Sequence, residues 1–124
     1  MTVKVVDASA FAAASFREAE ADNMGRRLAG HELHAPDLLR LEMVNVCLKK
    51  IRTHPDQRDI LIEQHRQSLG VFIQQHAIEP LQVFALAEKF NLSAYDASYL
   101  WLARSMGAEL VTLDERLRKA AAKA

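Results

Sequence analysis

Short apolar runs separated by longer segments of helical periodicity predict an alternation of strands and helices. The run Val3-Lys4-Val5-Val6 is typical of a short buried strand, because it is mainly apolar and rich in β-branched side chains. Short strands that alternate with helices favour a parallel sheet covered on both faces, and therefore an α/β fold. The expected strands are residues 3–6, 32–35, 76–79 and 109–113, and the expected helices are residues 8–14, 16–28, 37–52, 57–72, 80–89, 93–106 and 116–124.

Length and composition narrow the class of protein. The 124 residues suit one domain, and we expect residues 1–124 to form it. A formal net charge of zero argues against nucleic-acid binding by bulk positive charge, but leaves room for a local basic patch. The single cysteine, Cys47, lies in an apolar helical run, which fits a protein of the reducing cytoplasm. No uncharged run reaches the ~18 residues of a membrane span, so no membrane partner is expected.

Four acidic residues lie where the predicted elements would bring them together. Asp7 directly follows the first strand and Asp114 the last, while Glu42 and Asp96 lie near the starts of two apolar helical patterns. Open parallel sheets bind ligands beyond the carboxyl ends of their strands, which is where Asp7 and Asp114 fall. Carboxylates that meet at one point repel one another, and a hard divalent cation such as Mg²⁺ or Mn²⁺ removes that cost. Because carboxylate-bound Mg²⁺ typically works on phosphate esters, these residues predict a reaction at a phosphate ester.

Three of these carboxylates also have an ordinary structural explanation. Asp7 and Asp114 are suited to cap the helices that follow them, since an aspartate there accepts from free backbone N–H groups. Asp96 stands three residues after Ser93, which is the spacing of a capping box. The two explanations are compatible, because a cap also orients the carboxylate.

Glu42 also has two possible interpretations, one structural and one functional. Asn45 lies one turn further along the same side of the helix, and Lys49 falls on the same stripe. The stripe is either a narrow solvated face or the wall of a pocket that Glu42 enters while Lys49 stays in water.

Other motifs point less clearly to a site. His31 and His34 form a His-Glu-Leu-His segment, but residues at i and i+3 of a strand point to opposite faces, which disfavours zinc. The chain has no second cysteine, no Gly-rich phosphate loop and no Gly-x-Ser-x-Gly segment. Basic residues near the end of the chain would either guide a phosphodiester backbone or balance the negative end of the last helix. They are Arg116, Arg118, Lys119 and Lys123.

Four segments resemble the four motifs of PIN-domain nucleases, and more narrowly those of the VapC-type toxins of bacterial and archaeal toxin–antitoxin systems. The resemblance covers nearly the whole chain, in the usual order and at about the usual spacing. The segments are Val5-Val6-Asp7-Ala8-Ser9-Ala10, Leu41-Glu42-Met43-Val44-Asn45-Val46, Leu92-Ser93-Ala94-Tyr95-Asp96-Ala97-Ser98-Tyr99-Leu100 and Leu110-Val111-Thr112-Leu113-Asp114-Glu115-Arg116-Leu117.

The resemblance implies a three-layer α/β/α fold with a short, mainly parallel central sheet, and Mg²⁺- or Mn²⁺-dependent cleavage of RNA. It implies that Asp7, Glu42, Asp96 and Asp114 form a catalytic, metal-binding quartet, in which Asp7 and Asp96 are the principal ligands. Homodimers and a cognate antitoxin, which lays a peptide across the active site, are implied partners. The residues that would hold carboxylates or waters in place are Ser9, Asn45, Ser93 and Thr112.

The expected function is therefore that of an endoribonuclease toxin in which one or two metal ions activate a water for attack on phosphorus. Arg116, Arg118 and Lys119 are candidate contacts to the nucleic acid. The alternative is a non-catalytic PIN-like binding module, which would need a broken quartet. A phosphatase-like hydrolase with Asp7 as nucleophile normally has a second aspartate two residues on, where this chain has Ser9.

Overall fold

A computed structural model describes residues 2–123, and within them four short strands form one parallel sheet. The strands are β1 (Val3–Val6), β2 (Glu32–Pro36), β3 (Gln74–His76) and β4 (Glu109–Val111), in the spatial order β3-β2-β1-β4. All three strand pairs are parallel, and Val5 of β1 is in register with His34 of β2 and Leu110 of β4. The predicted parallel sheet is confirmed.

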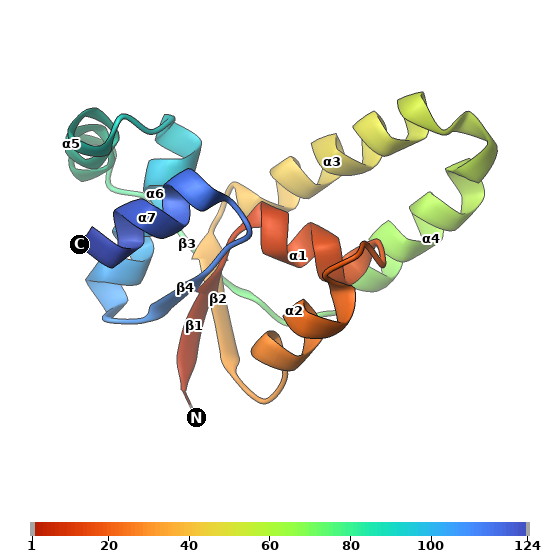
Figure 1. Cartoon of the computed structure of the whole chain (residues 1–124), viewed down its shortest axis with the longest axis horizontal. Helices are drawn as coiled ribbons and strands as arrows, with labels where there is room; N and C mark the ends of the chain where they lie inside the picture. Colours follow the sequence, from red (N-terminus) through yellow and green to blue (C-terminus); the bar gives the residue numbers. More distant parts are fainter. Residues whose placement is uncertain (1, 124) are drawn as a thin grey trace.

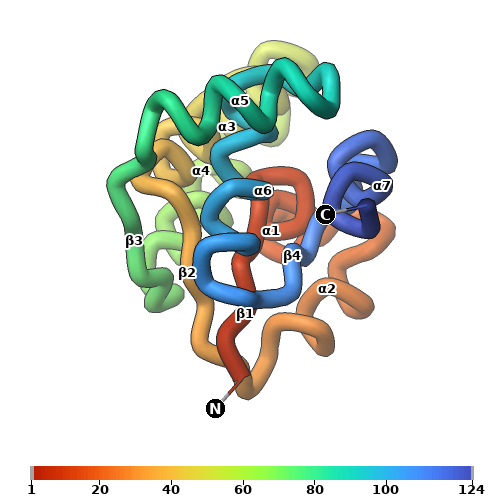
Figure 2. Tube along the Cα trace, turned by 90° about the vertical axis from the view of Figure 1, so that its left-hand side faces the viewer, coloured from red at the N-terminus to blue at the C-terminus, as the bar shows by residue number. Residues whose placement is uncertain are grey.

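Helices cover both faces of this sheet (Figures 1 and 2). Helix α1 lies on one face and α6 on the other (Figure 1), so the expected three-layer α/β/α architecture is confirmed. Helices α3 and α4 form an antiparallel hairpin that projects from the body of the molecule (Figure 1). The helices are α1 (Ala8–Ser15), α2 (Ala21–Leu28), α3 (Leu39–Thr53), the 3₁₀ helix η1 (Pro55–Gln57), α4 (Arg58–Ser68), α5 (Pro80–Phe90), α6 (Ala94–Met106) and α7 (Glu115–Lys123).

Strand β2 extends one residue beyond the prediction, to Pro36, and two other strands differ from it by two residues or more. The strand expected at residues 76–79 is β3, which begins two residues earlier and ends at His76. Beyond His76 the backbone turns into α5, whose first turn is capped by the Glu79 side chain as it accepts from the Gln82 N–H at 2.7 Å. The last strand, expected at residues 109–113, ends at Val111 because the next residues form the turn that caps α7.

The helix expected at residues 16–28 begins only at Ala21. Phe16 ends α1 and is buried, and Arg17 adopts a left-handed backbone conformation with φ of 55°. That conformation interrupts a right-handed helix, so residues 16–20 form a turn between α1 and α2. The helix expected at residues 57–72 is likewise shorter, and its α-helical part is α4.

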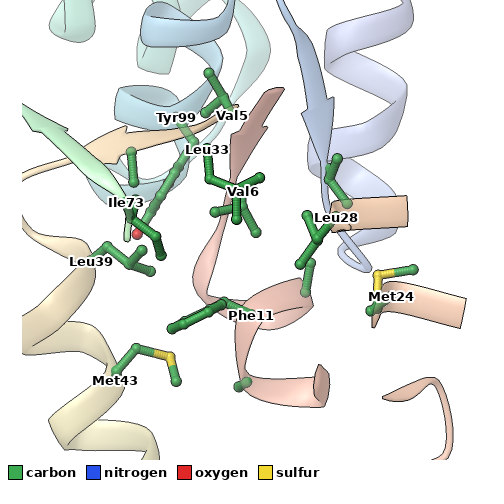
Figure 3. Close-up of a cluster of buried hydrophobic side chains, with 14 of the residues drawn as sticks. Val5, Val6, Phe11, Met24, Leu28, Leu33, Leu39, Met43, Ile73 and Tyr99 are labelled. Carbon is green, nitrogen blue, oxygen red and sulfur yellow. The ribbon is translucent and has the colours of Figure 1, made fainter. Parts of the chain in front are cut away.

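Buried hydrophobic side chains pack against both faces of β1 (Figure 3). Val5 and Val6 point to opposite faces of the sheet and are both fully buried. Phe11 of α1, Met43 of α3 and Tyr99 of α6 belong to the same buried cluster. Because β1 is clamped between two packed layers, the residue at its tip, Asp7, has a fixed position. None of the helices within residues 2–123 is both long and apolar enough to cross a membrane.

Candidate active site

Asp7 is buried at the carboxyl end of β1, with only 4% of its surface exposed. Its Oδ1 accepts hydrogen bonds from the Ala10 N–H at 2.9 Å and from the Ser9 hydroxyl at 2.8 Å. Its Oδ2 accepts from the Thr112 hydroxyl at 2.5 Å. Asp7 is thus the N-cap of α1, as the capping explanation predicts, and is also a carboxylate held rigidly by three donors.

Ser9 and Thr112 tie the tips of β1 and β4 together, although they are 103 residues apart in the chain. The Ser9 oxygen accepts from the Leu113 N–H at 3.0 Å, and the Thr112 oxygen accepts from the Asp114 N–H at 3.0 Å. Asp114 in turn caps α7, since its Oδ1 accepts from the Leu117 N–H at 2.9 Å. The two hydroxyls therefore connect Asp7 to the loop that carries Asp114.

Glu42 lies in the first turn of α3, and its Oε1 accepts a hydrogen bond from the Tyr99 hydroxyl. Tyr99 is almost completely buried, so its ring is held by the core and its hydroxyl fixes Glu42. Tyr99 lies in one of the four resembling segments, but the sequence predicted no role for it. The available signal was its position three residues after Asp96, which puts both residues on one side of α6.

Asp96 lies in the first turn of α6, where Ser93 is the N-cap. The Ser93 hydroxyl oxygen accepts from the Asp96 N–H at 3.1 Å, so this part of the expected capping box is present. Asn45 is exposed and lines a groove with Leu41 and Tyr95. It does not line the neighbouring cleft, which contains Glu42 and Asp96. Its role in holding the carboxylates stays a prediction.

The four predicted carboxylates meet in one open cleft of about 560 Å³. They reach it from four different elements: Asp7 from the tip of β1, Glu42 from α3, Asp96 from α6, and Asp114 from the loop before α7. The remaining lining residues in the described part of the chain are Ala8, Ser9, Ala12, Glu18, Val46, Lys49, Lys50, Tyr99 and Leu113.

Burial and mutual repulsion raise the pKa values of three of these carboxylates. Burial raises the pKa of Asp7, and the charge of Asp96 adds to the rise, against the hydrogen bonds that Asp7 accepts. Burial also raises the pKa of Glu42, with contributions from Asp96 and Asp7. The pKa of Asp96 is raised first by burial and then by Asp114. The cleft is therefore a place where negative charge is unfavourable in the absence of a cation.

The donor chemistry of the cleft fits a hard divalent cation, because all four predicted ligands are carboxylates. Within residues 2–123, no three Asp, Glu, His or Cys side chains lie close enough together to hold a metal ion by themselves. An open arrangement suits Mg²⁺, which usually takes one or two protein carboxylates and fills its other positions with water and substrate phosphates.

The raised pKa values predict how stability depends on pH. Because folding raises the pKa of Asp7, Glu42 and Asp96, the folded protein binds more protons than the unfolded chain at mildly acidic pH. Without a divalent cation, their contribution to stability should fall as pH rises from about 4, the unfolded value, through the raised values.

Mg²⁺ should reverse this loss at neutral pH if it binds the ionised carboxylates. At roughly 100 times its dissociation constant, Mg²⁺ should raise Tm by about 5–10 °C at pH 7.5 and by much less at pH 4.5. Thermal unfolding followed by circular dichroism, with Mg²⁺ or with a chelator, measures the difference. Equal Tm values with Mg²⁺ and chelator at pH 7.5 would contradict cation binding in this cleft.

Two of the three candidate nucleic-acid contacts of α7 already interact within the protein, and none of the three lines the cleft. Arg116 donates to the Asn91 carbonyl oxygen at 2.7 Å, and its positive charge lowers the pKa of Asp96 against the rise from burial. Arg118 forms an ion pair with Glu115 at 2.5 Å, and Lys119 is exposed. The role of these three residues in RNA binding stays a prediction.

Comparison with known proteins identifies the class to which this fold and this cleft belong. A family model described as the PIN domain matches residues 4–123, and the chain therefore belongs to the PIN-domain family. Its relatives are named as VapC ribonucleases. Ribonuclease VapC3 of Pyrobaculum aerophilum is 34% identical over 118 residues, which cover 91% of this chain and 90% of the relative. Ribonuclease VapC9 of Mycobacterium tuberculosis is 36% identical over 119 residues, which cover 91% of this chain and 87% of the relative.

Solved structures agree with this classification. The fold superposes on a crystallised protein from Pyrobaculum aerophilum with a TM-score of 0.76 and 25% identity, covering 96% of this chain and 84% of the other. It also resembles VapC20 of Mycobacterium tuberculosis, a toxin that cleaves the sarcin–ricin loop, with a TM-score of 0.67. At 15% identity over 94% of each chain, that second likeness concerns the fold alone.

Proposed function

We propose that this chain is a metal-dependent endoribonuclease and the toxin component of a type II toxin–antitoxin pair. The observation that carries the proposal is the meeting of four carboxylates from distant parts of the chain in one cleft of a PIN-domain fold. The naming of its relatives as ribonucleases supports RNA as the substrate.

The side chains of the cleft support a mechanism of hydrolysis by water. When bound, Mg²⁺ or Mn²⁺ would lower the pKa of an attacking water and neutralise charge on the phosphate oxygens. Asp7, held by Ser9 and Thr112, and Asp96, at the start of α6, would be the principal ligands. Glu42 is fixed by the Tyr99 hydroxyl, and so presents its carboxylate in a defined direction.

A serine nucleophile is a poor alternative in this cleft. The Ser9 hydroxyl donates to Asp7 and its oxygen accepts from the Leu113 N–H. No histidine of residues 2–123 lines the cleft to act as its base.

Cleavage of RNA with and without metal tests the proposal. We expect cleavage of a single-stranded RNA in Mg²⁺ or Mn²⁺, a loss of at least about a hundredfold in rate with a chelator, and recovery when the metal is restored. Cleavage that persists in the chelator would reject the metal mechanism. RNA binding without cleavage in any of these conditions would favour the non-catalytic binding module.

The proposal includes two protein partners, a cognate antitoxin and a second copy of the chain. Large apolar side chains that α3 and α5 leave exposed support association with another protein. Leu41 is 74% exposed, Leu81 79% and Phe84 63%. We expect a gene for a small antitoxin next to the gene for this chain, which the genome sequence would check.

A further inference from the structure

The cleft contains charged residues that the acidic quartet does not include. Among the described residues, five carboxylates and two lysines line it. The fifth carboxylate is Glu18, from the turn between α1 and α2, and the lysines are Lys49 and Lys50 of α3. With more negative than positive side chains, the cleft would repel a phosphodiester chain unless cations lie along its path.

Lys50 is already neutralised within the protein. Its Nζ lies 2.6 Å from the Glu18 Oε2, and the same ammonium stands 5.6 Å from the centre of the Phe16 ring. An ion pair and an aromatic contact together hold this side chain against the turn between α1 and α2. Lys50 therefore has little free charge to offer a ligand.

Lys49, unlike Lys50, is not held in an ion pair within the described part of the chain. It lines the same cleft and is exposed, and within residues 2–123 no carboxylate lies within 4.0 Å of its ammonium. It follows Glu42 by seven residues, or two turns, so the two Cα atoms are on one side of α3 and separated by about 10 Å along the helix. Lys49 is thus a positive charge without an acidic partner among the described residues, in a cleft that five carboxylates line.

We propose that Lys49 binds a phosphate of the single-stranded substrate that flanks the phosphate being cleaved. The inference rests on the proposed nuclease function, since it assigns a substrate contact in that same site. A cation held by the quartet would neutralise the reacting phosphate, but a phosphate about 10 Å away along α3 needs a charge of its own. A lysine suits this task, because its ammonium is a compact point charge on a flexible stem. Lys49 is a binding residue and takes no part in bond cleavage.

Binding of a single-stranded RNA oligonucleotide, measured at several salt concentrations with a chelator present, tests the inference without requiring cleavage. Lys49→Gln should weaken binding about fivefold and lower the slope of log K against log salt by about 0.7. Lys49→Arg should restore both values. Lys89→Gln is the matched control, because Lys89 is exposed on α5 and lines none of the clefts described here; it should bind like the wild type. With Mg²⁺ present, Lys49→Gln should raise KM and leave kcat within about twofold.

The outcomes separate this inference from the proposed function. Unchanged binding and an unchanged salt slope in Lys49→Gln would overturn it, and so would an equal loss in Lys89→Gln, which would indicate bulk charge. A wild-type protein that cleaves no RNA, but whose RNA binding weakens in Lys49→Gln alone, would reject the nuclease and keep Lys49 as a phosphate contact.

Discussion

Asp7→Asn is expected to lower kcat for RNA cleavage by on the order of a thousandfold. Asp7 lines the acidic cleft, and its buried carboxylate is the proposed principal ligand of a cation there. Asparagine has almost the same shape but carries no charge and offers one acceptor oxygen instead of two. The substitution should therefore lower metal affinity and leave most of the local geometry in place.

The fold should survive this substitution. Asparagine is as good an N-cap as aspartate, so its oxygen can still accept from the Ala10 N–H and the Ser9 hydroxyl. The Thr112 hydroxyl can rotate to accept from the new amide. Removing one charge also relieves repulsion from Asp96. We therefore expect Tm in a chelator to change by no more than a few degrees.

Asp59→Asn provides the matched control for cleavage assays. Asp59 undergoes the same chemical change but is a fully exposed residue of α4, away from the cleft. It should retain the wild-type kcat. A kcat for Asp7→Asn within tenfold of the wild-type value would contradict the role of Asp7 as a principal ligand.

Phe11→Ala is expected to destabilise the protein by about 3–5 kcal/mol. Phe11 is 3% exposed and lies in the buried cluster between β1, α1 and α3 (Figure 3). Its ring also stands under the Arg40 guanidinium, at 5.8 Å from the ring centre. Truncation to alanine would leave a cavity and remove that contact, because the surrounding helices can relax only in part.

Phe72→Ala separates core packing from a general effect of losing a phenyl ring. Phe72 is 78% exposed, so the same substitution there should change stability by about 0.5 kcal/mol or less. Urea unfolding followed by circular dichroism measures both variants on one scale. A loss below about 1 kcal/mol in Phe11→Ala would mean that the core is packed differently around α1.

The sequence was most informative where a residue type has only a few physical uses. The apolar, β-branched run before Asp7 predicts a central strand, and the structure buries Val5 and Val6 on both faces of the sheet. Asp7 and Asp114 follow predicted strands, so parallel topology alone is enough to place both at one edge. Strand β3 was harder to place because Gln74-Gln75-His76 has no apolar alternation; pairing with β2 decides its position.

By itself, then, the sequence determined the α/β class, the parallel sheet and the set of four acidic residues, because periodicity and residue chemistry act locally along the chain. Tertiary structure alone decided which groups restrain them. The contacts of Thr112 with Asp7 and of Tyr99 with Glu42 join residues 105 and 57 positions apart. The pairing of Lys50 with Glu18, which leaves Lys49 without an acidic partner in the described chain, depends on the turn at Arg17. Such contacts, and the burial that raises the carboxylate pKa values, arise only when distant segments pack together, so no local pattern encodes them.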